Sequence, residues 1–131
     1  MRLVFDTNVY LAATKTGGYM QEQLCKAEPS GAYEIFISPA IILEIQQKLV
    51  TTFRKDNAEA TAFIRLVLQY VTEVYPARHI TGVLRDTDDH IILECALEAK
   101  AEAIVTADRE LLQLKNYEGI AIIHPTMLQY Y

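Results

Sequence analysis

The sequence predicts an α/β fold in which a mainly parallel sheet carries helices on both faces. Short apolar runs of β-prone residues alternate with longer segments of helical periodicity along the whole chain. Three of these runs predict strands most clearly: Leu3–Phe5, Tyr33–Ile37 and Ala103–Thr106. Because each is followed by a polar turn and then a helix, successive strands should run parallel. The 131 residues are 51% hydrophobic, so we expect one domain, residues 1–131, around a single core.

The helices are predicted from apolar residues at helical spacing and from the residues that begin and end them. Ser38 is a favoured cap, and Pro39 in the first turn costs no hydrogen bond. The predicted helices are Asn8–Ala13, Tyr19–Ala27, one from Ser38-Pro39 that buries Ile41, Ile45 and Leu49, a long one from Asp56 or Asn57 to about Val74, one from Asp89 to near Lys100, and one behind Asp108. The remaining segments are a short strand and a loop within Glu73–Leu84, a strand over Ile120–Ile123 and a tail over Pro125–Tyr131.

Composition disfavours several classes of function. A net charge of −5, from 12 basic and 17 acidic residues, gives no basic surface of the kind that tight nonspecific nucleic-acid binders need. No run reaches the roughly 18 apolar residues of a membrane span. Met1-Arg2 leads into a strand without a signal-peptide pattern, so we expect a cytoplasmic protein. Cys25 and Cys95 lack metal-ligand spacing and are expected to be small core residues.

Acidic residues follow two of the predicted strands directly. Asp6 ends the run that begins at Leu3, and Asp108 stands in the turn after the strand that ends at Thr106. In an open α/β sheet, ligands bind beyond the carboxyl ends of the strands, where side chains from several strands converge. Asp is also a favoured helix cap, so one such residue alone would indicate only a helix start. Two at equivalent positions indicate a site.

A third acidic stretch, Asp86-Thr87-Asp88-Asp89, stands at the start of the next helix. Capping and the helix dipole stabilise acids there by roughly 0.3–1 kcal/mol each, which explains one or two of them. A third carboxylate within four residues is unfavourable unless a cation compensates its charge. Mg²⁺ and Mn²⁺ prefer oxygen ligands of this kind.

Glu44 is a further candidate, and it lies on a helix. Its place between Ile41 and Ile45 draws it toward the core side, whereas its neighbours Gln46, Gln47 and Lys48 should face water. An acid at a core boundary needs a partner, which solvent or an arginine could supply if Glu44 stood alone.

Together, Asp6, Glu44, Asp89 and Asp108 would place four carboxylates at one edge of the sheet. Four such groups would repel one another and take up protons unless metal ions neutralised them. A bound Mg²⁺ or Mn²⁺ holds phosphate oxygens, helps to deprotonate an attacking water and stabilises the leaving oxygen. The pattern therefore suits hydrolysis of a phosphodiester.

Four short motifs carry a resemblance to a known family: Val4-Phe5-Asp6-Thr7-Asn8, Ser38-Pro39 through Glu44, Asp86-Thr87-Asp88-Asp89, and Ile104-Val105-Thr106-Ala107-Asp108 with Leu111-Leu112. In order and spacing the chain resembles a PIN-domain ribonuclease of the VapC-like toxin type along nearly its whole length. The resemblance implies a single three-layer α/β/α domain, an acidic Mg²⁺ or Mn²⁺ pocket, and endonucleolytic cleavage of single-stranded or structured RNA. It also implies the toxin of a toxin-antitoxin pair, with an antitoxin protein as partner, and a homodimer.

The resemblance also implies roles for individual residues. Asp6, Glu44 and Asp89 would be the principal metal-binding acids, and Asp108 the fourth and more variable one. Supporting roles would fall to Asn8, which would orient Asp6 or a water on its metal, to Thr106, which matches a small hydroxyl near the metal, and to Asp88, which either joins the ligands or only caps the helix.

Two other classes of protein fit parts of the sequence. A phosphatase of the haloacid-dehalogenase type also begins with a strand and an Asp and uses Mg²⁺, but it needs a second Asp where this chain has Asn8. A noncatalytic PIN-like scaffold would bind RNA or protein without cutting it, and four intact acids argue against that. His90 could touch substrate, although a hydrogen-bonded or exposed imidazole is expected. Contacts to an RNA backbone would have to come from scattered cations such as Lys15, Arg54, Arg85 and Arg109.

Overall fold

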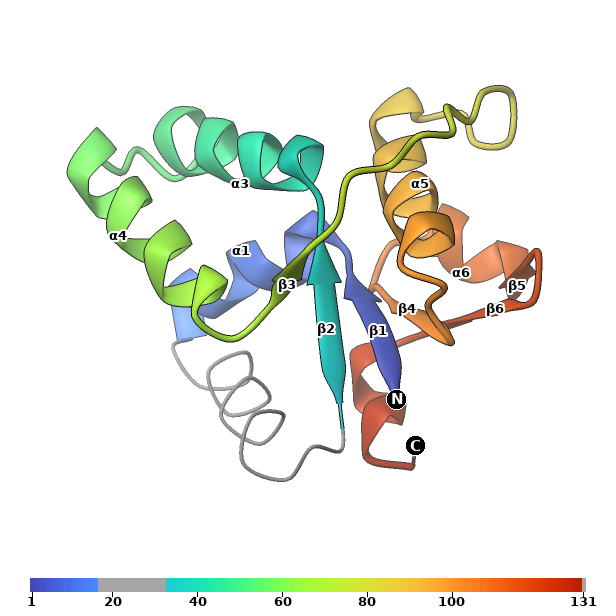
Figure 1. The fold of residues 1–131 in the computed structure, drawn as a ribbon. Coiled ribbons are helices and arrows are strands. Elements are labelled where there is room, and N and C mark those ends of the chain that lie inside the picture. Colours follow the sequence, from blue (N-terminus) through green and yellow to red (C-terminus); the bar gives the residue numbers. More distant parts are fainter. Residues whose placement is uncertain (17–32, 131) are drawn as a thin grey trace.

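The computed structural model describes residues 1–16 and 33–130, which are built around one six-stranded sheet (Figure 1). The strand order is β3-β2-β1-β4-β6-β5, and every pairing is parallel except that of β5 with β6. The mainly parallel sheet that the sequence predicted is therefore confirmed. The strands are β1 (Arg2–Phe5), β2 (Glu34–Ile37), β3 (Thr72–Glu73), β4 (Ala103–Val105), β5 (Asn116–Tyr117) and β6 (Ile120–Ile123).

Helices pack around the sheet in two groups, as the three-layer α/β/α expectation requires. Figure 1 shows α1, α3 and α4 beside β2 and β3, and α5 and α6 beside β4 and β6. α5 packs on β1, β2 and β4, α6 packs on β6, and α3 packs against both α1 and α4. The helices are α1 (Thr7–Thr16), α3 (Pro39–Thr51), α4 (Asn57–Leu68), α5 (His90–Glu98) and α6 (Arg109–Leu114), with 3-10 turns η1 (Thr87–Asp89) and η2 (Pro125–Tyr130).

The register of the central strands brings their carboxyl ends to one edge of the sheet. Phe5 at the end of β1 is paired with Val105 at the end of β4, and Val105 is paired with Ile123 at the end of β6. The next residues after β1 and β4 are Asp6 and Thr106, so both leave the sheet at the same edge. Leu3–Phe5 of β1 and all of β4 are apolar because these strands lie in the middle of the sheet, where side chains on both faces are buried.

α4 is shorter than the sequence predicted. Apolar spacing predicted a helix to about Val74, but α4 ends at Leu68. The chain then becomes extended, and Thr72 pairs with Phe36 as the edge strand β3. Pairing with the sheet therefore outweighs the helical spacing of Val71 and Val74, which a local pattern cannot reveal.

α1 is longer than predicted. The expected end was Ala13, before a polar and glycine-rich stretch, whereas α1 continues to Thr16. The Thr14 hydroxyl donates to the carbonyl of Leu11 at 2.8 Å, so this polar residue is accommodated on the helix. The predicted helix over Tyr19–Ala27, which holds Cys25, lies outside the described residues.

A short hairpin near the C-terminus was not predicted. β5 pairs antiparallel with β6 across a turn in which Glu118 and Gly119 have φ values of 50° and 87°. Two successive positive φ values match the twist of a tight hairpin, and the glycine at the second position adopts its φ without strain. Asn116 supports the turn by accepting a hydrogen bond from the Gly119 N–H at 3.0 Å. β5 has two residues, too few to give an alternating pattern in the sequence.

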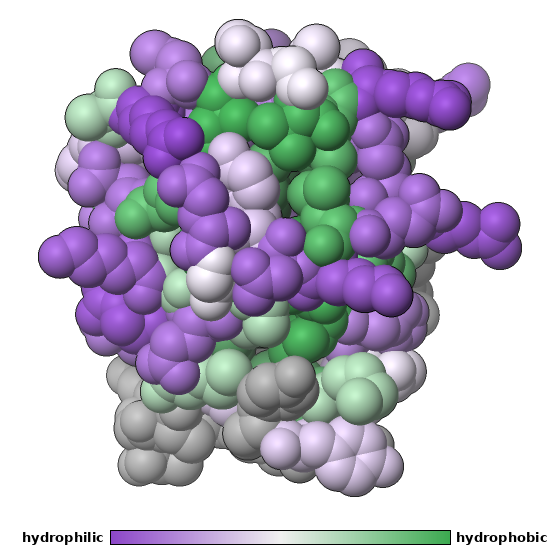
Figure 2. Space-filling model, turned by 90° about the vertical axis from the view of Figure 1, so that its right-hand side faces the viewer, coloured by the Kyte–Doolittle hydropathy of each residue, from purple (hydrophilic) through white to green (hydrophobic). Residues whose placement is uncertain are grey.

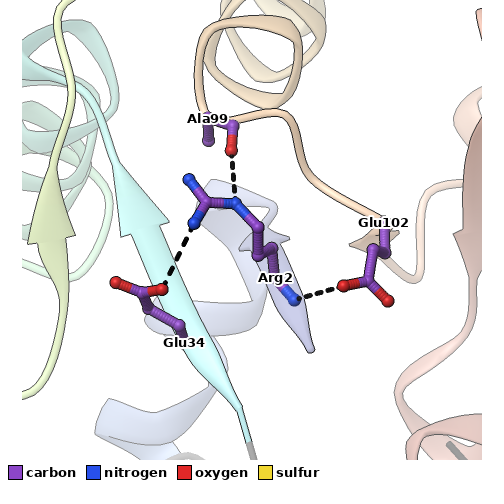
Figure 3. A network of polar contacts seen from close by, with 4 residues as sticks. All are labelled: Arg2, Glu34, Ala99 and Glu102. Atoms are coloured by element: carbon purple, nitrogen blue, oxygen red, sulfur yellow. Dashed lines mark hydrogen bonds and ion pairs between the residues drawn. The ribbon is translucent and has the colours of Figure 1, made fainter.

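At the edge opposite the strand ends, Arg2 joins β1 to its neighbours (Figure 3). Its Nε donates to the carbonyl of Ala99 at the end of α5 at 2.8 Å, and its guanidinium lies 4.3 Å from the ring centroid of Phe36 on β2. Nη1 also lies 3.4 Å from Glu34 Oε1, and the backbone N–H of Arg2 reaches Glu102 at 3.3 Å. These contacts fix the start of β1 to the far end of α5.

The surface on the side of α5 and α6 carries a band of apolar residues between strongly polar margins (Figure 2). Half-buried side chains such as Leu112, Leu114 and Ala121 pack against the core from α6 and β6. Cys95 on α5 is buried in the core, as predicted. Within residues 1–16 and 33–130, no helix is both long and apolar enough to cross a membrane.

Candidate metal-dependent active site

Asp6 is the most buried acid of the candidate site. Its residue is 2% exposed, and its backbone N–H continues the sheet by donating to Val105 O at 2.9 Å. Burial raises the pKa of the Asp6 carboxyl above its ordinary value. Hydrogen bonds from the Thr106 hydroxyl and the Asn8 backbone oppose that rise, whereas the nearby charges of Asp108 and Glu44 add to it. Asp6 is therefore held by donors that favour its charged form, within reach of two other acids.

Thr106 connects the ends of three elements through its buried hydroxyl. Oγ1 donates to Asp6 Oδ2 at 2.8 Å and accepts from the Asp108 N–H at 3.0 Å. The backbone N–H of Thr106 donates to Ile123 O at 2.9 Å, which extends the pairing of β4 with β6. The predicted hydroxyl position is thus beside Asp6, where it fixes the orientation of the carboxylate.

Asp108 lies at the start of α6, as predicted, and it acts as the helix cap. Its Oδ1 accepts from the Leu111 N–H at 3.1 Å. The residue is half-buried, and its charge contributes to the raised pKa of both Asp6 and Asp89. Asp108 therefore combines a structural role with a place near the other acids.

Asp89 carries an unusual buried oxygen. Its Oδ2 is buried without a hydrogen-bond partner in the described part of the chain, and its side chain makes no capping bond to α5. Burial raises the pKa of Asp89 from 3.8 to about 7, and the charges of Asp6, Asp108, Asp86 and Glu44 add to the rise. A buried carboxylate oxygen without a donor is costly unless a proton or a cation satisfies it.

The neighbouring acids Asp86 and Asp88 have different surroundings. Asp86 is the cap of η1, because its Oδ1 accepts from the Asp88 N–H at 3.0 Å. Asp88, for which the sequence allows a role as cap or as ligand, is exposed. The capping acid of this stretch is thus Asp86, and Asp89 is the more buried acid.

Glu44 lies on α3 with its side chain 17% exposed, which agrees with a position at the core boundary. Its partner is Lys48, whose Nζ lies 3.3 Å from Glu44 Oε1. Lys48 itself is partly exposed, with 38% of its side chain accessible, as expected for a residue that faces water. The spacing of four residues on one helix was the signal in the sequence that could have revealed this ion pair.

Asn8 and His90 occupy supporting positions. The Asn8 residue is exposed, and its contact with Asp6 is made through its backbone N–H. His90 is buried, and its Nε2 accepts a hydrogen bond from the Leu84 N–H at 3.0 Å. The expected hydrogen-bonded imidazole is confirmed.

The candidate ligand atoms are of the kind that a hard divalent cation binds. All four candidate side chains offer carboxylate oxygens, and Asp89 Oδ2 is a buried oxygen that a cation could satisfy. In the conformation described for residues 1–16 and 33–130, no three His, Cys, Asp or Glu side chains are gathered closely enough to hold an ion. The oxygens therefore have the right chemistry, and their convergence on one ion remains a prediction.

The fold is an α/β domain in which Asp6 and Asp108 follow two central parallel strands. They lie at the edge of the sheet where domains of this class bind their ligands. Residues 2–110 match the PIN domain family, and the chain belongs to that family. No curated protein matches the chain at a significant level.

Solved structures with the same fold include two VapBC complexes. One is VapBC2 from Rickettsia felis bound to a DNA fragment from their promoter, with 15% identity, a TM-score of 0.68, and coverage of 95% of this chain and 98% of that chain. The other is VapBC-1 from nontypeable Haemophilus influenzae, with 16% identity, a TM-score of 0.67, and coverage of 96% and 99%. At these identities the likeness concerns the fold.

Proposed function

We propose that the chain is a metal-dependent endoribonuclease that hydrolyses phosphodiester bonds in single-stranded or structured RNA. The observation that carries the proposal is the raised pKa of two of the candidate acids, Asp6 and Asp89. Both carboxyls have raised pKa values, burial is the largest cause in each, and the charge of Asp6 contributes to the rise at Asp89. Acids kept close together at this cost in a PIN domain are candidates for catalysis.

Asp6, Asp89 and Asp108, with Glu44, would hold the Mg²⁺ or Mn²⁺ ion. When bound, such an ion neutralises charge on the phosphate and makes a water more acidic. Without a cation the four acids repel one another, so we expect them to lie further apart in the metal-free protein than in the loaded one. Lys48 reduces that repulsion at Glu44 only.

The chain's own residues would position the reacting groups. Thr106 holds the Asp6 carboxylate through Oδ2, and the Asp108 N–H in turn holds the Thr106 oxygen. Asp89 Oδ2 has no hydrogen-bond partner in the described part of the chain, so it is the oxygen that a bound ion would satisfy. Asn8 contributes its backbone N–H to Asp6.

We further propose that the protein is the toxin of a toxin-antitoxin pair in the cytoplasm, inhibited by an antitoxin and assembled as a homodimer. The support is the resemblance of the motifs and the likeness of the fold to chains in two VapBC complexes. Copurification with the coexpressed product of a neighbouring gene would test the antitoxin. The mass of the purified protein in solution would test the homodimer.

The alternatives make different predictions for one experiment. Purified protein is incubated with labelled RNA and a matched single-stranded DNA, with Mn²⁺, with Mg²⁺ and with EDTA. We expect metal-dependent cutting of RNA that falls on the order of 100-fold in Asp6→Asn. Glu73→Gln, which changes an exposed acid on β3, serves as the matched control and should cut normally.

The outcome separates the candidate functions. RNA cutting that survives EDTA, or that is undiminished in Asp6→Asn, would contradict the proposal. Binding of RNA without turnover in any metal would favour the noncatalytic scaffold. A phosphatase of the haloacid-dehalogenase type would release phosphate from small phosphomonoesters, and the exposed Asn8 at its second-acid position argues against it.

A further inference from the structure

The segment between β3 and η1 is anchored along one face of α5. We define residues 77–85 as the strap, which Figure 1 shows as the yellow and yellow-green coil near α5. Glu98 Oε1 accepts from the Ala77 N–H at 3.0 Å, and Glu94 Oε2 accepts from the Ile80 N–H at 2.8 Å. His90 Nε2 likewise accepts from the Leu84 N–H of the strap. The three acceptors, His90, Glu94 and Glu98, are spaced four residues apart and so lie on one face of α5.

The last residue of the strap is anchored to a different helix. The Arg85 N–H donates to Oε1 of Glu110, which lies in the first turn of α6. Arg109 is the residue before Glu110 and begins α6. One hydrogen bond therefore holds the backbone of Arg85 beside the first turn of α6 and brings two arginines from distant parts of the sequence to the same place.

Both arginines adjoin the candidate acids. Arg85 directly precedes the stretch that begins at Asp86 and leads to Asp89, and Arg109 directly follows Asp108. Both residues are exposed. The Glu110 contact therefore joins the two segments that carry these arginines and the acids next to them.

Neither arginine has an evident structural task. Arg2 and Arg78 form ion pairs with Glu34 and Glu118, whereas the guanidinium groups of Arg85 and Arg109 form none with the part of the chain that is described. A cation in the first turn of a helix also opposes the helix dipole, which favours acids there. Because both guanidinium groups are free of ion pairs within the described residues, both are available to contact an anion.

We propose that Arg85 and Arg109 form a phosphate-binding pair that holds the backbone of single-stranded RNA at the rim of the acidic site. The inference rests on the proposed ribonuclease function and names the residues by which an acidic protein would bind a polyanion. Guanidinium forks bind phosphate oxygens in pairs and carry no base specificity. The scissile phosphate would lie over the acids, and the arginines would take a neighbouring phosphate of the same strand.

The test compares Arg85→Gln, Arg109→Gln and the double variant with Arg65→Gln, an exposed arginine on α4 that serves as the matched control. Binding of a fluorescein-labelled single-stranded RNA is measured by anisotropy in the Asp6→Asn background over a range of salt concentrations. We expect each rim variant to bind about tenfold more weakly. The slope of log affinity against log salt should fall by roughly 0.7 for each arginine lost.

Cleavage kinetics distinguish binding from a structural effect. In the otherwise wild-type protein, the rim variants should raise KM with little change in kcat, because a phosphate contact outside the reacting bond stabilises substrate and transition state equally. Arg→Lys at each position should restore part of the affinity, because it retains the charge. A loss of kcat with an unchanged salt slope would overturn the inference, as would variants that behave like Arg65→Gln.

The result also separates this inference from the proposed function. If the wild type cuts RNA and the rim variants match the control, only the phosphate-binding pair is wrong. If the wild type binds RNA through the two arginines but never cuts it, the pair is correct and the ribonuclease proposal fails. If the wild type neither binds nor cuts RNA, both are wrong.

Discussion

The Thr106 hydroxyl donates a 2.8 Å hydrogen bond to the Asp6 carboxylate, a residue 100 positions away in the sequence. The two residues meet because β1 and β4 are parallel neighbours whose ends are in register. Thr106 is 0% exposed, so this bond forms where water does not compete. The orientation of the most buried acid therefore depends on a side chain from the next strand.

Replacing Thr106 with Val tests the importance of that bond. The substitution keeps the shape of the side chain, but Asp6 loses the donor that opposes the rise in its pKa. We expect RNA cleavage to fall roughly 10- to 100-fold, as for other residues that orient metal ligands. Thr106→Ser, which keeps the hydroxyl, should cut close to the wild-type rate. Equal activity of all three proteins would show that the bond has no role in catalysis.

The stability of the metal-free protein should depend on pH through Asp89. Folding raises the pKa of Asp89 from 3.8 to about 7, so its protonated form is favoured in the folded state. Proton binding at Asp89 therefore stabilises the folded state. This stabilisation is complete below about pH 4 and is lost as the pH rises through 7. We expect unfolding in EDTA to become easier by about 1 kcal/mol between pH 5.5 and pH 8, after allowing for solvent screening.

Asp89→Asn is the control for that pH dependence. The amide cannot ionise, so the variant should be more stable than the wild type at pH 8 and should show a flatter profile between pH 5.5 and pH 8. Urea unfolding followed by circular dichroism measures both proteins. A wild-type profile that rises toward pH 8 would contradict the assigned pKa shift.

Arg2 should stabilise the fold without affecting the site. Arg2→Ala removes the bond to Ala99 O and the contact with Phe36, which together should cost about 1–2 kcal/mol in the free energy of unfolding. Glu34→Gln removes only an exposed ion pair and should cost less than about 0.5 kcal/mol. Urea unfolding compares the variants, and equal losses would show that the ion pair is the main contact.

Cys95 should be chemically inert in the folded protein. Burial raises the pKa of its thiol to about 12, and the thiolate is the reactive form. In a Cys25→Ser background, a thiol reagent such as DTNB should label no thiol in the native protein and one thiol in denaturant. Rapid labelling of the native protein would contradict the buried position of Cys95.

The sheet and its acidic edge could be predicted because their signals are local. The apolar run before Asp6 and the one before Asp108 each give a strand, a turn and a helix within a few residues. The parallel arrangement then places both turns at one edge, whatever the details of packing. The helix behind Asp108 followed from the same local rules.

Features that depend on tertiary contacts were not predictable in the same way. The end of α4 is set by pairing of Thr72 with Phe36, and the path of the strap is set by acceptors on α5 and α6. The sequence shows Arg85 and Arg109 only as scattered cations. Their common position depends on Glu110, whose contact with Arg85 spans 25 residues of sequence.

The most direct test of the account is calorimetric titration of Mn²⁺ into the wild type, Asp89→Asn and Glu73→Gln at pH 7 in buffers of different ionisation enthalpy. Because the pKa of Asp89 is about 7, binding should release about half a proton in the wild type and in Glu73→Gln, and less at pH 8. Asp89→Asn should bind much more weakly and release no proton from this group. Absence of Mn²⁺ binding in the wild type, or unchanged binding in Asp89→Asn, would contradict the assignment of these acids as a metal-dependent active site.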